Sequence, residues 1–310
     1  MEVSSGVQRP WSQLYERIGA RYGAIRQPDH RLQTRIVSAL GDAQPVLNVG
    51  GGTGNYEPTD RPVVALEPSE VMARQRRPGS APVVRGVAEG LPFADRSFGA
   101  ALATFTVHHW SDVRGGLGEL SRVSHRQVLL VHDRDLCDYY WITEYFPEIL
   151  AVPSEQHPAV DQLCRSLDVI RIETLAIPAD CSDGFCSAFW ARPEALLDPA
   201  LRAGSSSLSQ LDPAVAEGNA ERLKADLASG DWDSRYGFLR DLPEFDMGVP
   251  LAHRWRIGRV RSQRSFDVRK TNRPTCRIPS GFRIWHPEPA VCDTPLVGRE
   301  PLDIGRYRWG

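Results

Sequence analysis

A glycine-rich run constrains this chain more than any other feature of its sequence. Four glycines and a threonine occupy residues 50–54, directly after the short apolar segment 45–49. A short apolar segment bounded by glycines is typical of a buried strand that ends in a tight turn. Glycine adopts positive φ angles there, and without a Cβ it lets the backbone approach a ligand closely. The run therefore predicts a strand followed by a ligand-binding turn.

Further short apolar segments alternate with helical patterns along the chain. Strands are expected at 63–66, 83–87, 100–105, 127–132 and 169–175, and helices at 11–26, 30–40, 69–76 and 112–123. This alternation favours a parallel α/β sheet that is covered by helices on both faces. Residues 184–230 look helical in pieces. Residues 238–248 enter a last strand, which Pro250 is expected to interrupt.

The composition excludes several classes of protein. Of 310 residues, 41% are hydrophobic and 25% are charged, close to globular averages, which argues against a disordered or coiled-coil chain. No stretch approaches about 18 apolar residues, so no transmembrane helix is expected, and the N-terminus lacks a secretory pattern. The six cysteines have neither a disulfide-framework nor a zinc-type spacing. We therefore expect a reduced, cytoplasmic chain without a metal site.

Charge is distributed unevenly between the two ends of the chain. Residues 249–310 carry twelve Arg and one Lys against five acidic residues, a net of +8, whereas residues 1–248 have a net of −10. Clustered Arg can indicate nucleic-acid binding, but here it is scattered without a recognisable motif, so that interpretation is disfavoured. We expect 1–248 to be the functional domain. We interpret 249–310 as a basic C-terminal extension that is disordered, or frameshifted from near codon 248.

The spacing of the glycines narrows the class of ligand. The pattern is Gly-x-Gly-x-Gly, one residue shorter than the Gly-x-Gly-x-x-Gly of dinucleotide-binding turns. The shorter spacing favours a ligand that has no pyrophosphate. Glu67 ends the second expected strand, where a carboxylate can accept hydrogen bonds from both hydroxyls of a ribose.

Four segments in order carry a family resemblance: Val46–Gly54, Val64–Ser69, Gly86–Phe98 and Val107–Asp112. They resemble class I S-adenosylmethionine-dependent methyltransferases, in particular the type 11 group of ubiquinone and menaquinone biosynthesis methyltransferases. The resemblance implies a Rossmann-like, doubly wound, seven-stranded, mostly parallel sheet with S-adenosylmethionine as cofactor. It implies methyl transfer to a small-molecule acceptor. The alternatives are a protein that binds the cofactor without methyl transfer and, disfavoured by the glycine spacing, a nicotinamide oxidoreductase.

The resemblance also implies which residues hold the cofactor. By position these are Asn48, Gly50, Gly51, Gly52, Gly54, Glu67, Pro68, Ala88, Glu89 and Thr106. The chain departs from the family pattern at three positions. The family usually has an acid where Asn48 stands, and often an Asp where Val87 and Gly99 stand.

The acceptor side of the site is expected at the ends of the fourth and fifth strands. His108 is the candidate general base, because imidazole titrates near neutral pH, and His109 is a candidate for the substrate pocket. Asp133 follows the fifth strand and is a further candidate for the substrate pocket. Tyr15 and Tyr22 on the first helix are candidates for a lid over the site. The aromatic residues between 139 and 190 have two open interpretations, an acceptor pocket or ordinary core.

Overall fold

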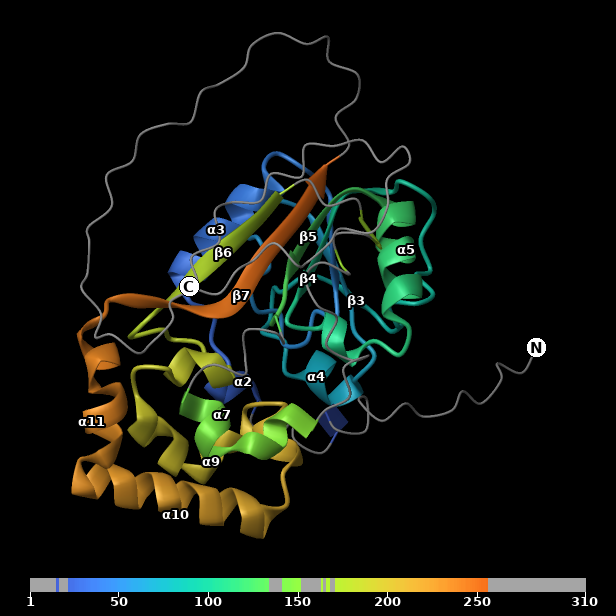
Figure 1. Cartoon of the computed structure of the whole chain (residues 1–310). Helices are drawn as coiled ribbons and strands as arrows, with labels where there is room; N and C mark the ends of the chain where they lie inside the picture. Colours follow the sequence, from blue (N-terminus) through green and yellow to red (C-terminus); the bar gives the residue numbers. More distant parts are fainter. Residues whose placement is uncertain are drawn as a thin grey trace, which may run out of the picture.

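Seven strands form one sheet in the order β3-β2-β1-β4-β5-β7-β6, with helices on both faces (Figure 1). β7 is antiparallel to β5 and β6, and the other pairings are parallel. The expected Rossmann-like, doubly wound, mostly parallel sheet is therefore confirmed. The computed structural model describes residues 15–16, 22–133, 141–151, 163, 166–167 and 171–255.

In that strand order, the strands from β2 to β5 are short and most of their residues are buried, as apolar segments between helical layers must be. Their bounds are β1 Val46–Val49, β2 Val63–Leu66, β3 Val83–Val84, β4 Phe98–Thr104, β5 Ser124–Leu130, β6 Arg171–Pro178 and β7 Glu244–Trp255. Val46 pairs with Val63 on one side and Ala100 on the other, so β1, β2 and β4 run in parallel register. The residues that follow these three strands consequently meet at one edge of the sheet.

β4 begins two residues before the expected strand, and Gly99 lies within it. The Gly99 N–H donates to the Pro45 carbonyl at 2.9 Å. A Cβ at position 99 would collide with the backbone of Gln44. The Asp that is common in the resembling family has no room here, because the chain before β1 lies directly against this position.

Three of the four helices near the sheet begin at polar caps. Their bounds are α2 Tyr22–Ile25, α3 His30–Leu40, α4 Glu70–Arg74 and α5 Val113–Val123. The side chains of Asp29, Ser69 and Asp112 accept hydrogen bonds from the first-turn backbone N–H groups of α3, α4 and α5. Each cap satisfies a donor that the helix itself leaves unpaired.

The interruption expected at Pro250 is wrong. β7 continues through Pro250 to Trp255, so the expected domain boundary at 248 falls inside the strand. Pro250 pairs with Thr174 of β6, where the register shifts between Thr174 and Ala176. A bulge of this kind tolerates a residue without an N–H, and the Pro250 carbonyl still accepts from Val131 N. Residues 256–310 lie outside the described residues, so the expectation for them stays a prediction.

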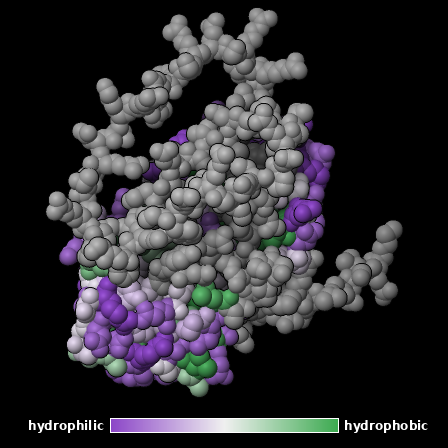
Figure 2. Space-filling view, in the orientation of Figure 1, coloured by the Kyte–Doolittle hydropathy of each residue, from purple (hydrophilic) through white to green (hydrophobic). Residues whose placement is uncertain are grey.

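Helical segments join β6 to β7, through the range 184–230 that was expected to be helical and beyond it to Asp241. They comprise η5 Cys186–Phe189, η6 Pro193–Leu197, α9 Pro199–Ala203, η7 Leu208–Gln210, α10 Pro213–Ser229, α11 Asp231–Tyr236 and η8 Gly237–Asp241. Together with α7, Trp141–Tyr145, and η3, Pro147–Ala151, they form a helical layer beside one end of the sheet (Figure 1). The part of this layer that is coloured in Figure 2 is mostly hydrophilic. No helix in the described ranges is long and apolar enough to cross a membrane.

The core has one cluster on each face of the sheet. Leu32, Ile36 and Leu40 of α3 pack in one, and Leu117 and Leu120 of α5 pack in the other.

The α3-side cluster also contains most of the aromatic residues whose role was open. The Trp141 indole N–H donates to the Trp190 carbonyl at 2.7 Å, and the Trp190 indole to the Ile177 carbonyl at 3.0 Å. Trp141 and Trp190 are buried core residues with satisfied polar atoms. Tyr139 and Tyr140 lie outside the described residues.

Candidate functional site

The glycine turn has the backbone conformation that its sequence predicts. The φ angles of Gly50, Gly52 and Gly54 are +68°, +49° and +94°, in the region that side chains disfavour. The N–H groups of Gly50 and Gly51 both donate to the Leu66 carbonyl, at 2.8 and 3.0 Å. The turn is therefore fastened to the end of β2, next to Glu67.

Thr106 closes one side of the turn from the end of β4. A Cβ on Gly50 would collide with the Thr106 hydroxyl. Thr106 is itself buried, directly before η2, Val107–His109. Positions 50 and 106, both expected at the cofactor and 56 residues apart in the sequence, are thus brought together.

Glu67 supports the turn with both carboxylate oxygens. One oxygen accepts from Gly52 N at 2.8 Å, and the other from Ser69 N at 2.8 Å. Burial raises the pKa of Glu67, and the two backbone hydrogen bonds oppose that rise without cancelling it. Each carboxylate oxygen can accept a second donor, so the group can hold the turn and two hydroxyls together.

A buried charge pair lies beneath the turn. The Arg76 guanidinium contacts both oxygens of Glu57, at 2.7 and 2.6 Å, and donates to the carbonyls of Gly51 and Gly52 at 3.3 and 3.2 Å. Asn48, expected at the cofactor, is fully buried and donates to Glu57 at 3.0 Å. Asn48 thus contacts Glu57, the acidic residue of the charge pair beneath the turn.

Other expected cofactor residues have structural partners. The Glu89 carboxylate accepts from the backbone N–H groups of Ser111 and Asp112, at 2.6 and 3.2 Å. Burial would raise the pKa of Glu89, but the hydrogen bonds from Ser111 and Asp112 outweigh burial and lower it. Ala88 is buried in the α5-side core. The Pro68 carbonyl accepts from Arg85 at 2.6 Å.

The two histidines after β4 have different surroundings. Their ring centroids are 3.8 Å apart. His108 is buried, with the His132 ring at 6.2 Å. His109 Nε2 lies 2.8 Å from the hydroxyl of Tyr15, and those two rings pack edge to face at 5.2 Å.

Tyr15 and Tyr22 lie together, with ring centroids 5.5 Å apart. Burial raises the pKa of both tyrosines, so their hydroxyls stay protonated near neutral pH. Next to Tyr15, the Glu16 carboxylate accepts from Ser69 Oγ at 2.9 Å and Glu70 N at 3.0 Å, at the start of α4. Residues 15 and 16 thus contact segments that follow β4 and β2, respectively.

An ion pair that is distant in sequence fixes the position of α2. Arg26 Nε donates to Asp183 at 2.6 Å, and Arg26 Nη1 donates to the Tyr22 hydroxyl at 2.6 Å. The Tyr56 hydroxyl donates to the same Asp183 carboxylate at 2.8 Å. Arg26 and Asp183 are both buried.

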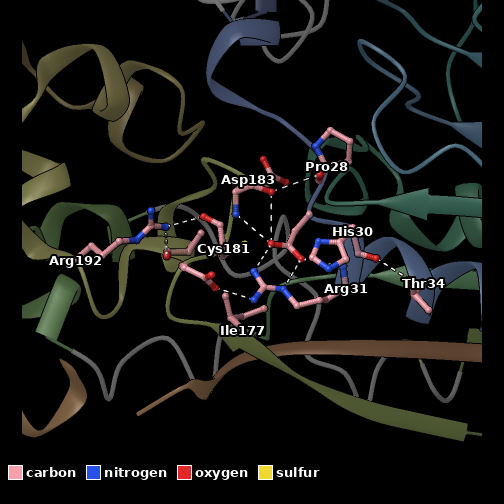
Figure 3. A network of polar contacts seen from close by, with 12 residues as sticks. Pro28, His30, Arg31, Thr34, Ile177, Cys181, Asp183 and Arg192 are labelled. Carbon is pink, nitrogen blue, oxygen red and sulfur yellow. Dashed lines mark hydrogen bonds and ion pairs between the residues drawn. The ribbon is translucent and has the colours of Figure 1, made fainter. Parts of the chain in front are cut away.

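A second polar network joins the same two regions of the chain (Figure 3). The Asp29 carboxylate, which caps α3, accepts from Arg31 side-chain nitrogens and from Ser182 N at 3.1 Å. Arg192 donates to the Cys181 carbonyl at 2.7 Å. The loop after β6 is therefore held against the start of α3.

Asp133 lies at the end of β5, where it was expected. Its backbone N–H donates to the Gly248 carbonyl at 2.8 Å, and its side chain is partly buried. Among the described residues, no group of His, Cys, Asp and Glu side chains could hold a metal ion.

Comparison with known proteins gives the family of this fold and site. Residues 47–131 match the family described as a methyltransferase domain. A crystal structure of a protein described as a methyltransferase from an antibiotic biosynthesis pathway of Anabaena variabilis ATCC 29413 is 30% identical, with a TM-score of 0.68. That similarity covers 74% of this chain and 98% of the Anabaena chain. Uncharacterized protein YafE of Escherichia coli K12 is 44% identical over 39 residues, which is 13% of this chain and 19% of YafE.

This chain belongs to the class I S-adenosylmethionine-dependent methyltransferases. S-adenosylmethionine, the cofactor expected from the sequence, is the cofactor of this class. The family match covers the segment that contains the glycine turn, Glu67 and the histidine pair.

Sequence reasoning missed several polar residues around the site. Glu16, Arg26, Glu57, Arg76 and Asp183 were not expected there. A buried Arg has no local sequence signal, and the partner of Arg26 is 157 residues away. Glu57 and Arg76 lie just beyond the two segments that carry the cofactor motifs, which is the one signal that could have found them.

Proposed function

We propose that this chain transfers a methyl group from S-adenosylmethionine to a small-molecule acceptor. The observation that carries the proposal is the meeting of a Gly-x-Gly-x-Gly turn with the Glu67 carboxylate at the carboxyl ends of β1 and β2. Ligands in open α/β sheets bind at this edge. The family to which the chain belongs supports the same activity.

The residues at the turn fit the chemistry of the cofactor. Glu67 would accept the two ribose hydroxyls through the lone pairs that Gly52 and Ser69 leave available. Two buried oxygens near the turn, Asn48 Oδ1 and Thr53 Oγ1, have no hydrogen-bond partner among the described residues and could accept further donors. When bound, S-adenosylmethionine supplies an electrophilic methyl group on a sulfonium.

The residues after β4 and β5 would serve the acceptor. We propose His108 as the base that removes a proton from the acceptor, because it lies directly after β4 at the functional edge. Tyr15 and Tyr22, which pack against each other, would form the lid. The 2.8 Å contact between Tyr15 and His109 would hold this lid at the same edge of the sheet. Asp133 would contact the acceptor from the end of β5.

Titration calorimetry tests the proposed function directly. We expect saturable binding of S-adenosylmethionine and S-adenosylhomocysteine and no binding of NADH. The protein is then incubated with S-adenosylmethionine that carries a labelled methyl group and with a panel of small alcohols, amines and carbon acids. The label should appear in one class of these acceptors. Binding of NADH without either sulfur ligand would reject the proposal in favour of an oxidoreductase.

A further inference from the structure

The proposed function assigns no role to the charge pair beneath the glycine turn. The side chains of Arg76 and Glu57 are only 5% and 9% exposed. A buried ion pair loses hydration that its mutual attraction only partly returns, so it is not explained by stability alone. Its remaining contacts therefore indicate what it does.

Those contacts converge on the turn. Besides Glu57, the Arg76 guanidinium donates to the carbonyls of Gly51, Gly52 and Ala81. It also lies directly under Gly54, because a Cβ at position 54 would come within 3.3 Å of Arg76 Nη1. One side chain thus contacts three of the four glycines.

Gly52 is held from both sides by charged side chains. Its N–H donates to Glu67 at 2.8 Å, and its carbonyl accepts from Arg76 at 3.2 Å. Glycine has more conformational freedom than any other residue, so an unsupported turn would lose much entropy on binding a ligand. Two opposite charges that fix one residue through its donor and its acceptor reduce that loss before the ligand arrives.

We propose that Arg76 and Glu57 are positioning residues that hold the glycine turn in its cofactor-binding conformation. Arg76 acts through the turn carbonyls. Glu57 fixes the guanidinium and is itself oriented by the amide of Asn48. This inference rests on the proposed function, since it concerns the site that would bind S-adenosylmethionine.

Three variants test the proposal, with S-adenosylhomocysteine affinity by calorimetry and thermal unfolding as readouts. Arg76→Met leaves Glu57 as an unpaired buried charge, so we expect both a lower Tm and a loss of affinity of roughly tenfold or more. The double variant Glu57→Gln/Arg76→Met removes both charges and keeps an oxygen that can accept from Asn48. It should recover most of the lost Tm but none of the affinity, because no donor reaches the turn carbonyls.

Arg202→Met is the matched control. The Arg202 side chain is 6% exposed, donates to the carbonyls of Leu196 and Leu197, and pairs with Glu217, all in the helical layer. Its removal leaves two carbonyls without their donor, whereas Glu217 is 61% exposed and stays hydrated, so we expect a smaller loss of Tm than in Arg76→Met and an unchanged affinity for S-adenosylhomocysteine.

Each outcome decides the proposal. Affinity that returns together with Tm in the double variant, or that falls equally in Arg202→Met, means that the pair is merely structural and overturns the positioning role. Failure of the unaltered protein to bind S-adenosylhomocysteine rejects the proposed function, and the positioning role with it. Normal binding by the unaltered protein and by all variants rejects the positioning role alone.

Discussion

Glu67 illustrates how one residue can serve the fold and the ligand together. Its two oxygens accept the N–H groups of Gly52 and Ser69, one in the turn and one at the cap of α4. The carboxylate therefore fixes the turn before a ligand binds, and retains lone pairs directed by that same geometry. Its ionisation state should affect ligand binding, because hydroxyl donors favour the charged form.

Ligand affinity should consequently depend on pH. Burial raises the pKa of Glu67, so in acid the carboxyl protonates earlier than an exposed glutamate does. A raised pKa favours folding below the ordinary glutamate pKa, an advantage that is lost as pH rises through the raised value. Binding of the ribose hydroxyls instead favours the charged carboxylate. Affinity for S-adenosylhomocysteine should therefore fall as pH falls through the raised pKa of Glu67.

Calorimetric titrations from about pH 8 down to about pH 5 check this expectation. Glu67→Gln should bind more weakly and lose the pH dependence. Glu70→Gln, at a half-exposed glutamate on α4, is the control and should keep the dependence of the unaltered protein. An identical pH profile in Glu67→Gln would assign the dependence to another group.

Gly99 and Gly118 give a prediction that does not involve the ligand. Gly99→Ala should destabilise the protein by about 1–3 kcal/mol, because its Cβ would meet the Gln44 backbone inside the sheet. Gly118→Ala, on α5 with open space at its Cβ, should stabilise by about 0.5–1 kcal/mol. Urea unfolding of both variants measures the difference, and an equal change in the two would contradict the close approach at Gly99.

At the scale of the element, α3 depends on a cap that also joins distant segments. Asp29 is fully buried at the start of the helix and accepts from Arg31 and Ser182. Burial acts to raise the pKa of Asp29, but its hydrogen bonds with Arg31 and Ser182 outweigh burial and lower it. The Asp29 carboxylate thus links the start of α3 to the loop after β6.

Asp29→Ala should therefore cost more than an ordinary cap. We expect a loss of about 2–3 kcal/mol, against about 1 kcal/mol for Asp212→Ala, at the exposed cap of α10. Because the pKa of Asp29 is lowered, its contribution is complete above the usual Asp pKa and is lost as pH falls below it. Urea unfolding at neutral and acid pH measures both effects, and equal losses in the two variants would show that the Ser182 contact adds nothing.

At the scale of the whole molecule, β7 completes the sheet between β5 and β6. Leu251 and Ala252 are fully buried and pair with both neighbouring strands. The C-terminal part of this strand, residues 249–255, was expected to belong to the basic extension. The described fold is therefore continuous through Trp255.

Two truncations test how much residues 249–255 of β7 contribute to stability. A chain that ends after Gly248 loses the β5 pairing of β7, so it should unfold at a much lower temperature or not fold. A chain that ends after Trp255 retains every described strand and should keep the Tm of the full chain. Equal Tm values for the two truncations would show that residues 249–255 are not part of the stable sheet.

The periodic part of the sequence predicted most of the elements. Helix 30–40 and strand 63–66 have the expected bounds, because apolar spacing and polar caps are local signals. The expected strand at 83–87 is shorter, with only Val83 and Val84 paired, because it lies at the sheet edge beside β2 alone. The expected break at Pro250 was wrong because the pairing of β7 with β6 is irregular beside Pro250, and no local sequence pattern reveals how two distant strands pair.

The sequence by itself predicted the alternation of strands and helices and the glycine turn, since both depend on neighbouring residues, and the family resemblance of its motifs implied the seven-stranded sheet and the cofactor. Only the tertiary structure showed that Arg76 contacts both Glu57 and the turn carbonyls, that Tyr15 contacts His109, and that Arg26 pairs with Asp183. Such polar pairs depend on which distant segments the folded sheet brings together. The contacts that stabilise these polar groups form only in the folded protein. No periodic pattern in the sequence therefore predicts them.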